Sequence, residues 1–194
     1  MIKFALIGNG GHAKEVMAQM GNKLTTFVED EYCDDNSIPL SKFKPSEFEV
    51  MVAISDPKIR QRIIEKLPMC TKFFTFIHPT ALLLNKDIKI GYGSFIGAYS
   101  ILTTNITLGK HSILNRGNQI GHDCVIGNFL SMMPGSIISG NVEIGDCVYV
   151  GTNGSIKEKT KVCSNVYIGS NATVVDNINS EGTYVGVPAR FKFL

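Results

Sequence analysis

The sequence of 194 residues lacks an apolar run long enough to cross a membrane, and it carries little excess charge. Its 19 Lys and Arg residues against 17 Asp and Glu residues give a formal net charge of +2, with no basic stripe. The first ten residues, MIKFALIGNG, lack the charged start, the long apolar stretch and the cleavage site of a signal peptide. We therefore expect a soluble, cytoplasmic protein that binds neither membranes nor nucleic acid.

Paired cysteines are missing as well, because the five present are scattered and never form a C-x-x-C motif. The four histidines do not provide three zinc-binding imidazoles at a fixed spacing. We therefore predict free thiols and no metal site. The cysteines are Cys33, Cys70, Cys124, Cys147 and Cys163.

What the sequence does contain is an aliphatic residue at every sixth position from Ile90 to Val174, fifteen positions without a miss. An α-helix repeats about every 3.6 residues and a strand every two, so a period of six fits a coil of three short strands separated by corners. An antiparallel sandwich would instead need strands and turns of variable length. We therefore predict an all-β, left-handed parallel β-helix of the hexapeptide-repeat type.

Glycine directly follows the aliphatic residue in eight of these repeats, and Asn115 takes that place in a ninth. Both residue types tolerate a positive φ, so we expect the left-handed residue of each corner at this position. The glycines are Gly91, Gly97, Gly109, Gly121, Gly127, Gly145, Gly151 and Gly169.

Residues 1–80 show a different sequence pattern, in which short apolar runs alternate with amphipathic segments. Two successive strand-helix-strand patterns are typical of a parallel sheet with crossover helices. We therefore predict an α/β Rossmann-like domain at 1–80 and the β-helix domain at 81–194. The predicted strands are Ile2–Ile7, Leu24–Val28, Glu49–Ile54 and Lys72–Phe76; the predicted helices are Ala13–Met20 and Pro57–Leu67, the second with Ile59, Ile63, Ile64 and Leu67 facing inward.

The tail after Val174 abandons the six-residue period. Pro188 has no backbone N–H and cannot extend a sheet ladder. We therefore expect residues 185–190 to pack as an irregular cover on the last coil.

A glycine-rich turn joins the first predicted strand to the first predicted helix. Gly8, Gly10 and Gly11 would let a phosphate approach the backbone N–H groups, and His12 could donate to a phosphate or sugar oxygen. Glu29 and Asp30 end the second strand, where they could bind a ribose or base. The alternatives are a purely structural turn and a solvated acidic loop.

His122 occupies the third position of a hexad, where the side chain should leave the corner and point outward. An exposed imidazole can take a proton from an attacking amine or hydroxyl at neutral pH, and the adjacent Asp123 could select its tautomer. The alternative is an inert surface histidine. His78 and His111 appear in settings that favour a structural role.

Five segments together resemble the NeuD/PglD-type sugar acyltransferases of bacterial glycan synthesis, and the likeness covers nearly the whole chain. That family combines a nucleotide-sugar-binding N-terminal domain with an acetyl-CoA-binding coil, and three subunits place each active site between neighbouring coils. The resemblance therefore implies a homotrimer that uses acetyl-CoA as co-substrate. The segments are Ile7–His12, Ile77–Ala81, Ile120–Gly127, Gly140–Val142 and Gly186–Arg190.

The resemblance also implies roles for individual positions. His122 matches the general base, and Asp123 stands where an acidic residue, often Glu, orients it, so the shorter side chain could act through water. Ser131 replaces a second His found close to the thioester in many relatives. The other matched positions are Gly8, Gly10, Gly11, His12, Glu29, Asp30 and Asn115 for the sugar nucleotide, and Gly140, Thr152, Ser170, Pro188 and Arg190 for the coenzyme.

The reaction that we expect is N-acetylation of a 4-amino-4,6-dideoxy sugar linked to UDP or dTDP. O-acetylation of a sialic acid is the alternative reaction, because Arg116 lies close to His122 in sequence and could meet a carboxylate. The alternative of another class is a non-catalytic trimeric scaffold that binds a nucleotide.

Overall fold

The N-terminal part of the chain forms a parallel five-stranded sheet with helices on both faces. In the computed structural model, which describes residues 3–21 and 24–193, its elements are β1 (Lys3–Ile7), α1 (Gly11–Met20), β2 (Thr25–Val28), β3 (Ile38–Pro39), β4 (Phe48–Val52), α2 (Pro57–Lys66) and β5 (Lys72–Phe73), with short 3-10 turns at Asp30–Tyr32 and Leu40–Lys42. The strand order is β3-β2-β1-β4-β5. Alternate residues of β1 face opposite layers, since Ala5 clusters with Ile63 of α2 and Leu6 with Val16 of α1.

The predicted Rossmann-like layer is confirmed, with differences at its ends. Ile2 lies outside the described residues, and β1 is described from Lys3. The fourth predicted strand is divided, because β5 ends at Phe73 and the next strand, Phe76–Ile77, pairs with Phe95–Ile96 in the coil. The short β3 was not anticipated, since polar residues precede it. Whether 1–80 and 81–194 are separate folding units stays a prediction.

Helix α2 begins as expected, and Ile63, Ile64 and Leu67 face the core as predicted, so its buried face differs from the predicted one only at Ile59. The Asp56 side chain accepts a hydrogen bond of 2.9 Å from the Ile59 backbone N–H, and Pro57 occupies the first turn. The prediction that Ile59 faces inward is wrong, because 40% of that residue is exposed. Arg60 is buried in its place, since α2 lies between the sheet and the coil and buries a second stripe.

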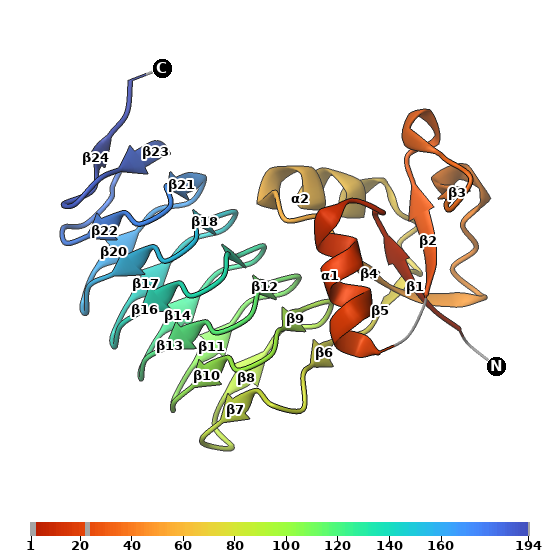
Figure 1. Cartoon of the computed structure of the whole chain (residues 1–194). Helices are drawn as coiled ribbons and strands as arrows, with labels where there is room; N and C mark the ends of the chain where they lie inside the picture. The colour runs from red at the N-terminus through yellow and green to blue at the C-terminus, as the bar shows by residue number, and fades with distance from the viewer. Residues whose placement is uncertain (1–2, 22–23, 194) are drawn as a thin grey trace.

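The chain from Phe76 onward winds into a stack of short strands with three faces (Figure 1). Each strand pairs in parallel with the strand three further along, eighteen residues later through most of the coil, as Ile113 does with Ser131. Face 1 consists of β6 (Phe76–Ile77), β9 (Phe95–Ile96), β12 (Ile113–Leu114), β15 (Ser131–Met132), β18 (Tyr149–Val150) and β21 (Val166–Ile168); face 2 of β7 (Leu82–Leu83), β10 (Ile101–Leu102), β13 (Gln119–Ile120), β16 (Ile137–Ile138), β19 (Ser155–Ile156) and β22 (Thr173–Val174); face 3 of β8 (Lys89–Ile90), β11 (Thr107–Leu108), β14 (Val125–Ile126), β17 (Glu143–Ile144) and β20 (Lys161–Val162).

The six-residue aliphatic series is the interior of this coil, as predicted. Its members from Ile96 to Val174 belong to one buried cluster, and Ile90 packs against it. The small residues two positions earlier, such as Ser94, Ser100 and Ser112, are fully buried. The parallel β-helix is therefore held together by a continuous apolar column, with one layer contributed by each turn.

The position of the left-handed corner residue was predicted wrongly. Positive φ values of 51° to 73° recur at every sixth residue from Gly93 to Asn171, two places after the position that we expected. The glycines after the aliphatic residue have a different cause, since a Cβ on Gly121 would lie 2.6 Å from the backbone N of Gly140 in the next coil. These glycines allow close packing of successive corners, and Asn115 is likewise not among the positive-φ residues.

The tail extends the sheet of face 1 rather than only covering it. Strand β23 (Gly182–Val185) pairs in parallel with β21, and β24 (Arg190–Phe191) returns antiparallel to β23. Pro188, which follows a cis peptide bond, lies in the turn between these strands, where its missing N–H is not needed.

The N-terminal sheet and the coil are packed together along face 1. Phe95 and Ile113 of that face share one buried cluster with Ala13 and Val16 of α1. Figure 1 shows α1 and one end of α2 next to the coil, although the two helices cover opposite faces of the sheet. Neither of these helices has the length or the apolar character needed to span a bilayer, and the described part of the chain has no other candidate.

Candidate active site

His122 lies where the chain turns from face 2 to face 3, a border that we call the 2/3 edge (residues 85–87, 103–105, 121–123 and 139–141). Its side chain is 56% exposed, as predicted, and its Nδ1 lies 2.7 Å from Asp123 Oδ2. A charged carboxylate can only accept, so the proton of the neutral ring is on Nδ1 and Nε2 keeps its lone pair. The contact is direct, so the shorter Asp side chain needs no bridging water.

The Asp123 carboxylate is held by two partners. Asn105 Nδ2 donates a hydrogen bond of 2.6 Å to Oδ1, and the His122 ring occupies Oδ2. The Asn105 amide and, after it, the His122 ring lower the pKa of Asp123 below its ordinary value. The carboxylate is therefore charged at neutral pH, as a partner that orients an imidazole must be.

The other ring nitrogen of His122 faces the corner of the next coil. A Cβ on Gly140 would lie 2.5 Å from His122 Nε2, so the ring rests over the Cα of this glycine. A side chain at position 140 would displace the ring. The juxtaposition leaves Nε2 beside backbone on an open edge, where a reacting group could approach.

The glycine-rich loop borders a cavity of about 280 Å³ at the carboxyl ends of β1 and β2. Gly8 has a φ of 111°, and its missing Cβ would lie 3.1 Å from the Ala53 carbonyl oxygen, so both conformation and space require glycine here. Gly10 and Gly11 lead into α1, whose N-terminal N–H groups favour an anion. The cavity wall includes Gly8, Asn9, Gly10, Val28, Glu29, Tyr32, Ile54, Ile59, Arg62 and Ile63.

His12 lies behind this loop rather than in the cavity. Only 7% of its side chain is exposed, and its ring packs edge-on against Phe95 of face 1. Burial, and after it the charge of Arg60, lowers the pKa of His12 to about 4, so the ring is neutral. Its role toward a phosphate stays a prediction.

The two acidic residues at the end of β2, Glu29 and Asp30, lie in different surroundings. Glu29 lines the cavity and is bound by Arg62 at 2.9 Å and Lys66 at 2.7 Å, both from α2. The Lys66 ammonium is the largest cause of the lowered pKa of Glu29. Asp30 accepts a hydrogen bond from the backbone of Ser41. Of the two predicted nucleotide contacts, only Glu29 is on the cavity wall.

Asn115 lies where face 1 turns into face 2, the 1/2 edge (residues 115–117, 151–153 and 169–171). It is buried, and its Nδ2 donates a hydrogen bond of 3.0 Å to Glu15 of α1. Arg116 pairs with the other oxygen of Glu15 at 3.1 Å. Asn115 and Arg116 thus join the coil to the N-terminal layer on a different edge from His122.

The residues predicted for the coenzyme are also divided between edges. Thr152 and Ser170 are exposed on the 1/2 edge, while Gly140 lies beside His122 on the 2/3 edge. Pro188 and Arg190 are exposed in the tail, where Arg190 lies 3.5 Å from Asp176. One chain therefore does not bring the predicted coenzyme residues together, nor does it bring His122 to the glycine-rich loop.

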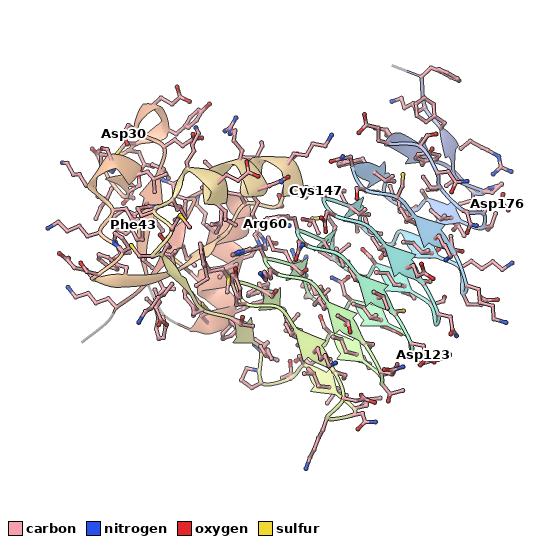
Figure 2. All side chains as sticks on the ribbon, turned by 180° about the vertical axis from the view of Figure 1, so that it is seen from behind. Asp30, Phe43, Arg60, Asp123, Cys147 and Asp176 are labelled. Carbon is pink, nitrogen blue, oxygen red and sulfur yellow. The ribbon has the colours of Figure 1, made fainter. Side chains whose placement is uncertain are left out.

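Sequence reasoning missed Arg60, which is fully buried between α2 and the coil (Figure 2). Its guanidinium donates to the carbonyls of His111 at 2.9 Å and Phe129 at 2.9 Å, and to Ser131 Oγ at 2.8 Å. Burial lowers the pKa of Arg60 to about 9, which still leaves it charged at neutral pH. The available signal was the helical spacing from Pro57 through 60 to Ile63, which places an arginine on a buried stripe.

Ser131 is enclosed by the same contact. It is fully buried, accepts from Arg60 and donates a hydrogen bond of 2.7 Å to the Ser55 carbonyl oxygen. Both functions of its hydroxyl are thus used inside the chain. Its predicted place near a thioester stays a prediction.

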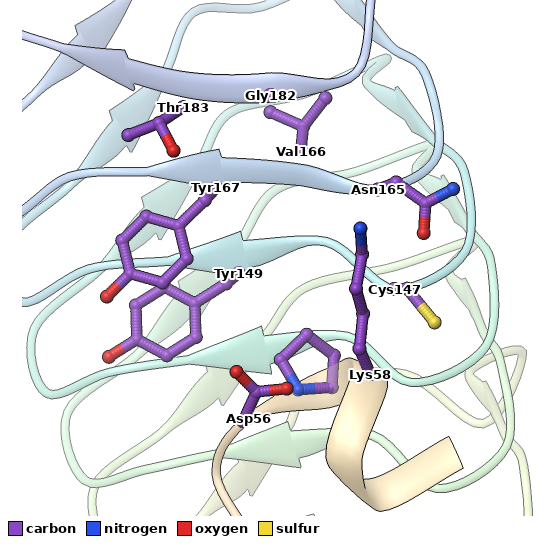
Figure 3. Close-up of a pocket in the computed structure, with 10 residues that line it drawn as sticks. Asp56, Lys58, Cys147, Tyr149, Asn165, Val166, Tyr167, Gly182 and Thr183 are labelled. Carbon is purple, nitrogen blue, oxygen red and sulfur yellow. The ribbon is translucent and has the colours of Figure 1, made fainter. Parts of the chain in front are cut away.

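A groove of about 200 Å³ beside the start of α2 was also not anticipated (Figure 3). Tyr149 and Tyr167 stack at 4.2 Å between ring centroids on face 1, with Asp56 and Lys58 opposite. Burial raises the pKa of the Tyr149 hydroxyl above its ordinary value. Across the described ranges, no three His, Cys, Asp or Glu side chains are placed to hold a metal ion.

Comparisons with known proteins identify the family of this chain. A family model for the PglD N-terminal domain matches residues 3–67. The acetyltransferase domain of PglB from Neisseria gonorrhoeae FA1090, solved in complex with acetyl coenzyme A, is 30% identical, with a TM-score of 0.84 over 97% of this chain and 98% of that chain. The chain belongs to the NeuD/PglD-type sugar acyltransferase family.

Two further proteins are similar to this chain, one over part of its sequence and one in its fold. GDP-perosamine N-acetyltransferase from Escherichia coli O157:H7 is 32% identical over 92 residues, which are 47% of this chain and only 41% of that relative. PerB from Caulobacter crescentus, in complex with CoA and GDP-perosamine, has a TM-score of 0.87 at 23% identity over 98% of this chain and 97% of that chain. The latter likeness shows the fold, an α/β domain followed by a left-handed β-helix.

Proposed function

We propose that this chain transfers the acetyl group of acetyl-CoA to the 4-amino group of a nucleotide-linked 4-amino-4,6-dideoxy sugar. The observation that carries the proposal is the Asp123–His122 pair, which leaves Nε2 as an acceptor beside Gly140 on an exposed edge. The cavity at the glycine-rich loop supports a nucleotide diphosphate as the part of the acceptor substrate that binds there.

In the proposed reaction the sugar amine attacks the thioester carbonyl carbon, so a C–N bond forms and the C–S bond breaks. His122 Nε2 takes the proton that the amine loses, and the departing CoA thiolate takes up a proton in turn. Asp123 stabilises the ring while it is charged. Binding both substrates in one cleft supplies the proximity, and no covalent enzyme intermediate is required.

The distribution of the site residues supports a homotrimer with active sites between subunits. The N-terminal layer covers face 1, whereas His122 lies on the edge opposite that face, and Figure 2 shows Asp123 on the side of the coil away from the N-terminal layer. A neighbouring protomer can bring its 2/3 edge to the loop and the 1/2 edge of the first. Threefold closure would also cover the apolar residues of face 2, where Leu82 is 52% and Ile137 40% exposed.

The nucleotide and the sugar are the finer parts of the proposal. UDP or dTDP remains the proposed carrier, and the GDP-linked sugar named for two relatives is the alternative carrier. The argument for a sialic acid acceptor is weakened, because Arg116 is engaged by Glu15 on the 1/2 edge of its own chain.

A thiol-release assay tests the proposal. Acetyl-CoA is combined with UDP-, dTDP- or GDP-linked 4-amino-4,6-dideoxy sugars or with sialic acid, and free CoA is measured. We expect turnover with one of the amino sugars and a loss of about 10²- to 10⁴-fold in His122→Ala, with acetyl-CoA binding retained. Turnover only with sialic acid would support the O-acetylation alternative. No CoA release with any acceptor would favour the scaffold alternative.

A further inference from the structure

A ladder of polar side chains runs along the 2/3 edge below His122. Asp87 accepts hydrogen bonds from Thr104 Oγ1 at 2.9 Å and from the backbone N–H of Asn105 at 2.9 Å. Asn85 donates to the same Asp87 carboxylate and to Thr104. The ladder therefore fixes the corner that carries Asn105, one coil before the corner that carries Asp123.

Asn105 connects this ladder to the proposed catalytic pair. Its backbone is left-handed, with a φ of 51°, and its Nδ2 donates to Asp123 Oδ1 at 2.6 Å. Because a carboxylate cannot donate, the amide nitrogen and not the amide oxygen must face Asp123, so the orientation of the Asn105 side chain is determined. A contact across two coils thus determines where the carboxylate of Asp123 lies.

The two carboxylate oxygens of Asp123 bind different partners, and this division holds the His122 ring in place. Oδ1 is occupied by Asn105 and Oδ2 by His122 Nδ1, so rotation of the carboxylate would break one hydrogen bond or both. Asp123 and His122 are exposed, with 44% and 56% of their side chains accessible, so packing alone does not hold them. Without the Asn105 amide, the carboxylate could turn toward water and release the ring.

We propose that Asn105 is a positioning residue for acetyl transfer, which fixes the Asp123 carboxylate and thereby the Nδ1-protonated tautomer of His122. This inference rests on the proposed function, in which Nε2 of His122 accepts the proton. Asn105 acts through Asp123 and does not itself touch the reacting atoms.

Asn105→Gly is the most informative variant, because glycine adopts the left-handed conformation without steric strain and removes the side chain that carries the amide. Asn165→Gly is the matched control: Asn165 is also left-handed, with a φ of 63°, but it lies on the groove of Figure 3, away from the 2/3 edge. We expect kcat to fall by about tenfold in Asn105→Gly, with KM for acetyl-CoA unchanged within about twofold. We expect Asn165→Gly to keep the wild-type kcat.

Asn105→Asp provides the readout that a merely structural role would not move. A second carboxylate beside Asp123 adds negative charge near the ring, so the acidic limb of the kcat/KM profile should move to higher pH by about one unit. An acidic limb at the wild-type position in Asn105→Asp, or equal kcat values in the two glycine variants, would overturn the proposal.

The ring itself can be observed without turnover. In ¹⁵N NMR spectra of the labelled imidazole, the wild-type chain should show the Nδ1-protonated tautomer of His122, and Asn105→Gly should show a mixture of tautomers. An unchanged tautomer in Asn105→Gly would overturn the positioning role even if the enzyme is active. Absence of CoA release by the wild-type protein would refute the proposed function alone, because the tautomer measurement still decides the role of Asn105.

Discussion

At the scale of single residues, the most consequential side chain outside the candidate site is Arg60. Its three guanidinium nitrogens donate to the backbone carbonyl of Ile54, which precedes α2, and to the carbonyls of His111 and Phe129 at two corners of the coil. One side chain therefore satisfies buried acceptors in both parts of the chain. Arg60 also has a positive charge that is buried without a salt-bridge partner among the described residues. The many hydrogen bonds to carbonyl oxygens compensate for this burial.

Replacing Arg60 should therefore destabilise the whole chain. We expect Arg60→Ala to lower the free energy of unfolding by about 3 kcal/mol, because several buried carbonyls lose their donor and a cavity is left. Urea unfolding followed by circular dichroism measures this change. Arg62→Ala is the control on the same helix, where the exposed pair with Glu29 should contribute less than about 1 kcal/mol. Equal effects of the two variants would contradict the role of Arg60.

His111 makes stability depend on pH. Burial, followed by the charges of Arg60 and Lys110, lowers the pKa of His111 to about 4, and the pKa of His12 is lowered to about 4 as well. As the pH falls from about 6.5 toward 4, the unfolded chain binds protons that the folded chain does not, so the free energy of unfolding must fall.

Urea unfolding at pH 7 and at pH 5 measures this dependence. We expect the wild-type chain to lose about 4 kcal/mol from these two rings, about 2 kcal/mol from each, between the two pH values. In His111→Phe about half of that loss should disappear, whatever the absolute stability of the variant. A slope equal to that of the wild type would show that His111 is not the neutral buried group described above.

At the scale of the elements, the corners of the coil contain two kinds of glycine with different reasons to be there. Gly109 has an ordinary φ, but a Cβ at that position would lie 2.6 Å from the backbone N of Asn128 in the next coil. Gly117 has a φ of 70°, with open space around the missing Cβ. The first kind of glycine is needed because successive coils pack too closely to admit a Cβ. The second kind is needed only because its backbone is left-handed.

Alanine substitutions at these two positions separate the two causes. We expect Gly109→Ala to lower the free energy of unfolding by about 3 kcal/mol through overpacking of the backbone, and Gly117→Ala to lower it by about 1 kcal/mol through the strain of a left-handed residue. Thermal or urea unfolding gives both values. A larger loss in Gly117→Ala than in Gly109→Ala would refute this assignment.

The elements also show how far the sequence predicts this structure. The period of six predicts the coil and the exposure of His122, because the place of a residue within the hexad decides whether its side chain points inward. The left-handed residue was misplaced by two positions, since glycine has two uses and sequence alone does not separate them. The helical spacing aligns Arg60 with Pro57 and Ile63, but Arg60 was missed because its burial also depends on how α2 lies against the coil.

At the scale of the whole molecule, the central feature is the separation of the proposed site into two halves. The loop from Gly8 to Gly11 borders the cavity beside α2 in the N-terminal layer. His122 and Asp123 lie on the edge of the coil that is opposite this layer. Asn115 and Arg116, on the 1/2 edge, are bound to Glu15 of their own α1. The activity that we propose therefore requires a neighbouring protomer to bring the second half.

Mixed trimers test this claim most directly. His122→Ala removes the base, and Gly10→Trp obstructs the nucleotide cavity; each variant alone should show little CoA release with the amino-sugar nucleotide. When the two are denatured together and refolded at equal amounts, about a quarter of the sites combine an intact loop with an intact His122 from the neighbour. We predict that the mixture recovers about a quarter of the wild-type rate. A mixture that stays as inactive as the separate variants, while native mass spectrometry shows mixed trimers, would contradict a site shared between protomers.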